Sequence, residues 1–186
     1  LLSFDLGPAN QLIDDLTYKY FKKNYDKNGI IAKKGKKNQK ILDIFYKDGY
    51  FKKKPPKSLD REYFDKYKSL LSENTAEDAI HTASILTVES ILIGLININF
   101  QITKILLTGG GRKNKFIFKE LINRLPNIKI ELIDNYNFNG DLLEAEMFGY
   151  IAVRRLKGLP ISNPDTTGVS KAITGGEIFG KILTKC

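Results

Sequence analysis

Cysteine and histidine are almost absent from the sequence. Its 186 residues include one cysteine, Cys186, and one histidine, His81. A single cysteine excludes an internal disulfide and a cysteine-based zinc site, and a single histidine excludes histidine-rich metal centres and disfavours a Ser-His-Asp triad. His81 lies within an expected helix, where a structural role is favoured over a catalytic one. The low cysteine content fits a reducing compartment and predicts a cytoplasmic protein.

Long apolar runs are also scarce. The most apolar segment, residues 91–100, is shorter than the roughly 20 residues that a membrane-spanning helix needs. The N-terminus lacks the basic-then-apolar order of a signal peptide. We therefore expect no membrane partner. The chain opens on Leu-Leu-Ser-Phe without a methionine, in what reads as a strand already under way, which suggests a piece of a longer protein.

The composition is that of a folded domain with excess positive charge. Apolar residues make up 42% of the chain, and 30 Lys+Arg face 21 Asp+Glu, a net charge of +9. Two clusters carry much of this charge: Lys33, Lys34, Lys36, Lys37 and Lys40, and Lys52, Lys53, Lys54 and Lys57. They indicate either a solvated surface or a patch for phosphate-rich partners. Arginine is nearly absent from both clusters, so the solvated surface is favoured and nucleic acid is disfavoured as a partner.

Strand patterns and helix patterns alternate along the chain. Helical spacing predicts helices over 12–23, 40–48, 63–71, 76–98, 114–124 and 140–156. Buried-strand patterns predict strands that end at residue 4 and that cover 104–108 and 128–133. The helix after Thr75 is apolar nearly all round and is expected to be central, and Leu143, Met147, Tyr150 and Ile151 are spaced for burial. This order predicts an α/β fold with a largely parallel sheet and a helical and loop insertion over 24–75.

The first turn that could carry chemistry follows the N-terminal strand pattern, in Phe4-Asp5-x-Gly7-Pro8-x-Asn10. A carboxylate at the carboxyl end of a strand points into the crevice where α/β proteins bind ligands. Asp5 is therefore a candidate base or magnesium ligand, or it only caps the next helix. Gly7 lets the backbone turn and approach a ligand, and Asn10 is a candidate substrate contact.

The second turn contains three consecutive glycines, Gly109, Gly110 and Gly111, with Asn114 close behind. Three glycines between a strand and a helix leave bare backbone, as a flat base or a phosphate requires, although a plain turn is the alternative. The spacing matches neither a P-loop nor a dinucleotide fingerprint.

A third turn places Asp141 and Glu144 near a helix N-terminus. Compensation of the helix dipole explains either residue alone. If Glu144 faces the crevice of Asp5, the two carboxylates can share a water molecule. A basic loop with Lys57, Ser58 and Arg61 either closes over a ligand or is an ordinary surface loop.

Together these motifs resemble the C-terminal half of the anhydro-N-acetylmuramic acid kinases. The matching stretches keep the family's order: FDLGPANQLID at 4–14, YDKNG at 25–29, PPKSLDREYF at 55–64, LLTGGGRKN at 106–114 and LLEAEMFGYIAVRRLKGLP at 142–160. The resemblance implies one lobe of a ribonuclease H-like, actin-like ATPase fold, a mixed sheet flanked by helices. That fold is shared by sugar kinases, heat-shock protein 70 and actin.

The family uses ATP and magnesium to open the 1,6-anhydro ring of its amino sugar with water and to phosphorylate O6. The product is N-acetylmuramic acid 6-phosphate, in cell-wall recycling. By resemblance, Asp5 is the general base and Glu144 helps to hold the water and the sugar. The glycines at 109–111 with Asn114 form the adenosine-side turn, and Lys57, Ser58 and Arg61 belong to the substrate loop.

The sequence also departs from the family pattern. Ala9 stands where glycine is usual, and Leu59 and Asp60 replace a Thr-Gly pair in the substrate loop. The family's Gly-Thr-Ser-x-Asp-Gly turn, which contacts the ATP phosphates, does not occur in residues 1–186. The resemblance therefore implies a single C-terminal lobe whose N-terminal partner is a separate chain or is lost. An inactive remnant lobe and a basic nucleic-acid-binding module are the alternatives, and a homodimer stays open.

Overall fold

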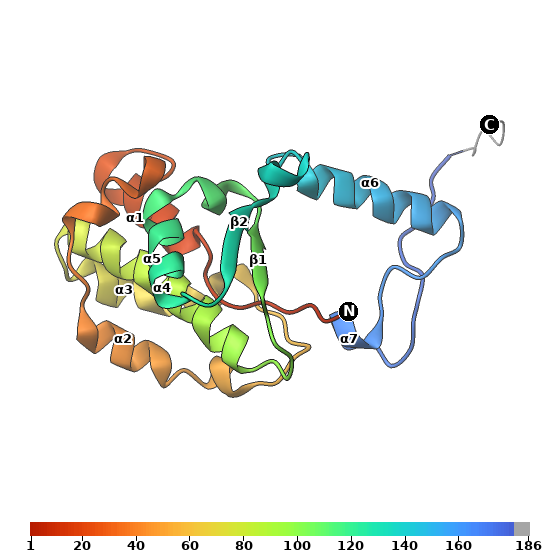
Figure 1. Cartoon of the computed structure of the whole chain (residues 1–186), viewed down its shortest axis with the longest axis horizontal. Coiled ribbons are helices and arrows are strands. Elements are labelled where there is room, and N and C mark those ends of the chain that lie inside the picture. The colour runs from red at the N-terminus through yellow and green to blue at the C-terminus, as the bar shows by residue number, and fades with distance from the viewer. Residues whose placement is uncertain (181–186) are drawn as a thin grey trace.

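The structure, a computed structural model, describes residues 1–180, so Cys186 lies outside the described residues. Figure 1 shows a helix-rich body from which one long helix, α6, projects. The helices are α1 Gln11–Phe21, α2 Gln39–Tyr46, α3 Lys66–Ser72, α4 Ala76–Ile96, α5 Lys115–Arg124, α6 Leu143–Leu156 and α7 Pro164–Thr167. The strands are β1 Lys104–Leu107 and β2 Lys129–Leu132, and short 3-10 turns connect many of these elements.

Helix α4 forms the centre of the body, as its all-round apolar pattern predicts. Thr75 caps it by accepting a hydrogen bond from the Asp78 amide at 3.2 Å. At 21 residues it is long and apolar enough to cross a membrane, so the expectation from the shorter run 91–100 was wrong about length. The run 91–100 covers only the C-terminal part of this helix, because Thr and Ser interrupt the continuous apolar run further upstream. The body buries 67% of its most apolar window, which identifies a core helix.

Helices α1, α2, α3 and α5 pack around α4 and share one hydrophobic core with it. The segment 24–75 contributes an aromatic cluster in which the Phe45 ring lies 4.6 Å from that of Phe51 and 5.4 Å from that of Tyr67, between ring centroids. On the other side of α4, His81 hydrogen-bonds the Ala32 carbonyl at 2.7 Å and packs on Phe116. The expected structural role of the histidine is therefore confirmed.

The sheet has two parallel strands in the described residues. Lys104 pairs with Lys129 and Leu107 with Leu132, and α5 connects the strands. The α/β class is thus confirmed. The described residues do not contain the expected mixed sheet, because their one sheet consists of these two parallel strands. The expected strand end at residues 1–4 was wrong: the segment has no ladder partner within residues 1–180, and the Ser3 amide donates instead to the Asp165 carbonyl at 3.3 Å. An apolar run forms a strand only when a neighbour satisfies its backbone groups.

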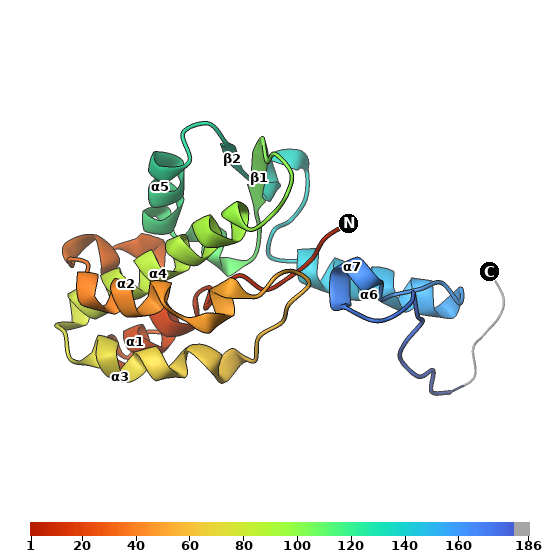
Figure 2. The same ribbon diagram turned by 90° about the horizontal axis from the view of Figure 1, so that it is seen from below.

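Helix α6 forms where the sequence predicts it, but none of its residues is buried. Met147 is 48% exposed and Tyr150 62% exposed, so the expected buried face is open. Figures 1 and 2 show the helix extending away from the body in both views. The spacing of apolar residues in α6 is typical of a helix that packs against another element, but no part of the described chain packs on it.

Candidate functional site

The N-terminal turn runs directly across the central helix. A Cβ on Gly7 would overlap the side chain of Ser90, and one on Gly94 would overlap Leu6. The small residues Ser90 and Gly94 of α4 therefore admit this segment. Gly7 is required by this close approach, and its φ lies outside the left-handed region, so the predicted sharp turn is not the reason for the glycine.

Asp5 is held by its backbone and by one carboxylate oxygen. Its Oδ2 accepts a hydrogen bond from the Leu59 amide at 2.8 Å, and its carbonyl accepts one from the Tyr50 hydroxyl at 2.6 Å. Among the described residues, Oδ1 receives no hydrogen bond. The interpretation of Asp5 as a helix cap was wrong, because the N-cap position of α1 is Asn10, which itself makes no side-chain capping hydrogen bond. The side chain is exposed and leaves one oxygen free for a ligand.

The triglycine turn, Gly109–Gly111, follows β1 and offers bare backbone. Gly109 has a φ of +68°, which only glycine adopts without strain. No atom lies within 4 Å of the position that a Cβ would take on Gly109 or Gly110. Gly111 faces the Asn10 side chain, whose amide atoms would lie 3.2 Å from such a Cβ. The two predicted turns therefore meet at Asn10 and Gly111.

Two neighbouring cavities share the triglycine turn as a wall. The first, of about 540 Å³, is lined by the N-terminal turn, including Asp5, by α4 and by all three glycines. The second, of about 720 Å³, is lined by Thr108, Gly109, Gly110 and the first turns of α6, including Glu144. Asp5 and Glu144 thus border the triglycine turn from two neighbouring cavities, and their convergence on one crevice stays a prediction.

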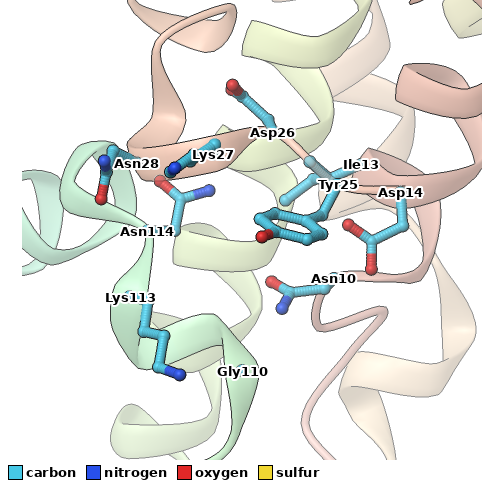
Figure 3. A pocket seen from close by; sticks show the side chains of 10 residues that line it. All are labelled: Asn10, Ile13, Asp14, Tyr25, Asp26, Lys27, Asn28, Gly110, Lys113 and Asn114. Carbon is cyan, nitrogen blue, oxygen red and sulfur yellow. The ribbon is translucent and has the colours of Figure 1, made fainter. Parts of the chain in front are cut away.

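A third cavity, of about 360 Å³, lies on the other side of Asn10 (Figure 3). Asp14 of α1 and Tyr25 reach it from one side, and Lys113 and Asn114 reach it from the other. Burial, reinforced by the neighbouring Asp15 charge, raises the pKa of Asp14 to about 6, although the Arg61 charge opposes the rise. Sequence reasoning gave no role to Asp14 or Tyr25, because nothing in the local pattern distinguishes an acid facing a cavity from one facing water.

Asn114 is buried at the edge of this cavity and caps α5. Its Oδ1 accepts hydrogen bonds from the Phe116 amide at 3.0 Å and from the Ile117 amide at 3.2 Å. The carbonyl oxygen is therefore occupied, which leaves the amide nitrogen as the group that faces a ligand (Figure 3). The predicted cofactor residue is also a structural one.

The sequence model of the family described as anhydro-N-acetylmuramic acid kinase matches residues 1–181. The chain belongs to this family. It is 38% identical to the anhydro-N-acetylmuramic acid kinase of Zymomonas mobilis over 96% of this chain and 48% of that protein. The identity to the enzyme of that name from Caulobacter vibrioides is 36%, over 98% of this chain and 48% of that protein. The chain spans about half the length of the curated relatives it matches.

Ala9 explains one departure from the pattern of the anhydro-N-acetylmuramic acid kinases. Its φ of +48° lies in the left-handed region, which glycine occupies at little cost. The Thr87 hydroxyl holds this turn by donating to the Ala9 carbonyl at 2.5 Å. Glycine is thus the natural residue here, and alanine is accommodated with strain.

The Lys57–Arg61 loop contacts Asp5 through its backbone: the Asp5 amide donates to the Lys57 carbonyl at 3.0 Å, and the Leu59 amide donates to Asp5 Oδ2. The Lys57 ammonium donates to the Tyr50 carbonyl at 3.2 Å and lies 4.2 Å from the centroid of the Tyr50 ring, and burial, with the nearby Lys53 charge, lowers its pKa. Ser58 is exposed and lines none of these cavities. Arg61 borders a hollow of about 430 Å³ together with Asp5. The structure thus brings Arg61 to Asp5, and it leaves Ser58 outside.

Asp5 is also the predicted magnesium ligand. Within residues 1–180, no three acidic, histidine or cysteine side chains are grouped to hold a metal ion. Magnesium in phosphoryl-transfer sites commonly takes one or two carboxylates and completes its shell with water and phosphate oxygens. A single carboxylate with a free oxygen fits that use, and the assignment of Asp5 to magnesium stays a prediction.

Proposed function

We propose that this chain supplies the C-terminal half of an ATP-dependent kinase for 1,6-anhydro-N-acetylmuramic acid, which yields N-acetylmuramic acid 6-phosphate. Family membership supports a kinase. The observation that carries the proposal is the position of Asp5 and Glu144 on two cavities that share the triglycine turn. The single cysteine and the use of ATP fit a cytoplasmic reaction in cell-wall recycling.

Asp5 acts as the general base in this proposal. Its free Oδ1 takes a proton from water while the water oxygen bonds to the anomeric carbon. The bond from that carbon to O6 breaks, and O6 takes the terminal phosphoryl group of ATP, with ADP as the leaving group. Glu144 holds the water and the sugar. A positioned base contributes roughly 10²–10⁴-fold to such a step.

The bare backbone of Gly109 and Gly110 would seat the adenosine end of ATP, and the Asn114 amide lies at the edge of the adjoining cavity. Asn10 lies between the cavity of Asp5 and the cavity of Asp14, and Arg61 lies beside Asp5. Both residues are placed to contact the sugar. Magnesium, when bound, would neutralise charge on the transferring phosphoryl group. Asp5 is the carboxylate that would hold it, as the alternative to its role as base, since the free Oδ1 serves one use or the other.

The partner in this proposal is the N-terminal half that the relatives carry. Helix α6 exposes Met147 and Tyr150, which line the cavity that contains Glu144, and Phe148 and Val153, which flank them. Contiguous exposed apolar side chains on a folded protein mark an interaction site. A partner that covers this face also closes the Glu144 cavity and excludes water from it. A second copy of this chain is the alternative occupant of the face.

Complementation tests the proposal. The chain is mixed with the N-terminal half of the Zymomonas mobilis relative, and phosphorylation of the anhydro sugar is followed by ADP release. We expect turnover with both halves and none with this chain alone. Asp5→Asn abolishes turnover and Glu144→Gln lowers it at least roughly 100-fold. The exposed substitutions Asp43→Asn on α2 and Glu73→Gln after α3 are matched controls that leave turnover unchanged.

Two results would contradict the proposal. Turnover by this chain alone would show that no partner half is needed. Complex formation without turnover would favour the inactive remnant, for which the strained Ala9 and the exposed Ser58 already argue. Met147→Glu keeps the body intact and prevents association with the N-terminal half. Size-exclusion chromatography of this variant separates that partner from self-association, which shifts the elution of the chain when it is alone.

A further inference from the structure

Arg112 is a buried side chain between the triglycine turn and the loop that leads into α6, and its side chain is 4% exposed. Its Nε and Nη2 donate to the two carboxylate oxygens of Asp134 at 2.7 and 3.0 Å. Its Nη1 donates to Asp141 Oδ1 at 2.8 Å and to the Gly109 carbonyl at 2.9 Å. A two-pronged arginine–carboxylate pair fixes direction as well as distance. One side chain thus ties Gly109 to both ends of the loop 134–141.

The backbone of the loop also lies flat against the guanidinium group. A Cβ on Gly140 would lie 2.6 Å from Arg112 Cζ, so only glycine fits there without displacement of the arginine. The Gly140 carbonyl in turn accepts a hydrogen bond from the Gly109 amide at 3.3 Å. The triglycine turn and the loop are therefore joined on both sides of Arg112.

Helix α6 depends on this joint at its N-terminal end, whereas the segment after it returns to the N-terminal segment through the hydrogen bond from the Ser3 amide to the Asp165 carbonyl. None of its residues is buried, and no other helix or strand of the described chain packs extensively on it. Its remaining contacts lead to the following segment, where Arg154 donates to the Pro160 carbonyl and Arg155 to that of Gly176. Glu144 lies in the first turn of α6. Its position relative to the triglycine turn therefore follows from the loop that Arg112 holds.

We propose that Arg112 is a positioning residue that holds Glu144 and the triglycine turn in a fixed relation. The consequence for catalysis rests on the proposed function, whereas the fixed relation is a property of the chain itself. Lys113 provides the contrast. Its ammonium contacts Asp141 Oδ2 at 2.6 Å, but its side chain is 60% exposed, and solvent screens such a pair.

Distance measurement between spin labels tests the fixed relation without any ligand. Labels are attached to cysteines introduced at Lys119 on α5 and Ala152 on α6, both exposed, in a chain whose Cys186 is replaced by serine. The parent gives one narrow distance distribution. Arg112→Met at least doubles its width, and Lys113→Met, the matched control, leaves it narrow. Asp134 and Asp141 are each partly exposed, so the loss of Arg112 strands no buried charge and the body folds.

Gly140→Ala is the second variant. It keeps every charge and pushes the loop off the guanidinium, so we expect the same broadening as for Arg112→Met. An unchanged narrow distribution in both variants would overturn the proposal. Equal broadening in Lys113→Met would also overturn it, since the surface pair would then hold the loop as well as Arg112 does.

The complemented kinase gives a second readout. Displacement of the triglycine turn raises KM for ATP, and displacement of Glu144 lowers kcat, so Arg112→Met lowers kcat/KM for ATP roughly 10- to 100-fold. If Arg112 only stabilised the fold, its loss would reduce the amount of folded enzyme and leave the KM for ATP unchanged, and that result would contradict the proposal. If the parent pair shows no turnover, the proposed function fails, and the label distances still decide the role of Arg112.

Discussion

The carboxylate of Asp48 holds the helical layer that supports the Asp5 turn, and its replacement by asparagine is expected to remove a defined pH dependence. Its oxygens accept hydrogen bonds from the Tyr50 amide at 2.9 Å, from the Tyr63 hydroxyl at 2.6 Å and from the Tyr67 hydroxyl at 2.8 Å. The Lys66 ammonium lies 2.6 Å away. Tyr50 in turn donates to the Asp5 carbonyl, so the network extends to the candidate site.

The magnitude follows from the pKa of Asp48. Burial by itself opposes ionisation, but the hydrogen bonds from Lys66, Tyr63, the Tyr50 amide and Tyr67 outweigh it and lower the pKa from 3.8 to about 2. Such a difference from the unfolded chain corresponds to about 2 kcal/mol of folding free energy. Because the folded pKa is the lower one, the unfolded chain binds the proton first as the pH falls. The stabilisation is complete above about pH 4 and is lost between about pH 4 and pH 2.

Urea denaturation followed by far-UV circular dichroism measures this effect. At neutral pH, Asp48→Asn is expected to unfold with about 2 kcal/mol less free energy than the parent, and the difference should vanish below about pH 2. Comparison with the parent cancels the other acids whose pKa is lowered: Asp78, Glu131, Asp134 and Asp141. Asp43→Asn, exposed on α2, is the control and follows the parent at every pH. A constant difference between parent and Asp48→Asn across this range would refute the reasoning.

Three further substitutions probe the same body. Asp14→Asn is expected to stabilise the chain at neutral pH by roughly 1 kcal/mol after solvent screening. The folded pKa of about 6 means that the parent loses this stability as the pH rises from about 4 to 6. Urea titrations that show the same loss in the variant would contradict this expectation. Ala9→Gly relieves the positive φ and should raise Tm by a few degrees, and a lower Tm would count against strain at this turn. Gly7→Ala overlaps Ser90 and should cost about 1–3 kcal/mol in the free energy of unfolding, which Ser90→Gly in the same chain partly restores; a full cost in the double variant would place the clash elsewhere.

The sequence predicted the helices well, because the residues that begin a helix and give it an apolar face lie close together along the chain. Thr75 and Asn114 cap α4 and α5 through hydrogen bonds to amides two or three residues ahead, and such caps can be read from the sequence. The open turn at Gly109 was also predictable, since a run of three glycines seldom serves packing. These features depend on neighbours within one helical turn.

Long-range features could not be predicted in the same way. The apolar run at residues 1–4 has the composition of a strand, but its ladder partner would lie elsewhere in sequence, and the described chain supplies none. Arg112 gives no local sign of burial, because its carboxylate partners Asp134 and Asp141 lie 22 and 29 residues away. The resemblance to the family drew attention to the glycines beside it and passed over the arginine.

The contrast between the body and α6 links the fold to the proposed partnership. The body closes a hydrophobic core of its own around α4. Helix α6 has the periodic apolar pattern of a packed helix, yet none of its residues is buried. Its apolar side chains therefore form a surface that another polypeptide would cover. Glu144 lies on the exposed helix, whereas Asp5 lies on the body. In the proposed function, the two acids form a working pair only if the joint at Arg112 is rigid and the apolar side chains of α6 are covered, so association with a partner would be a condition of catalysis.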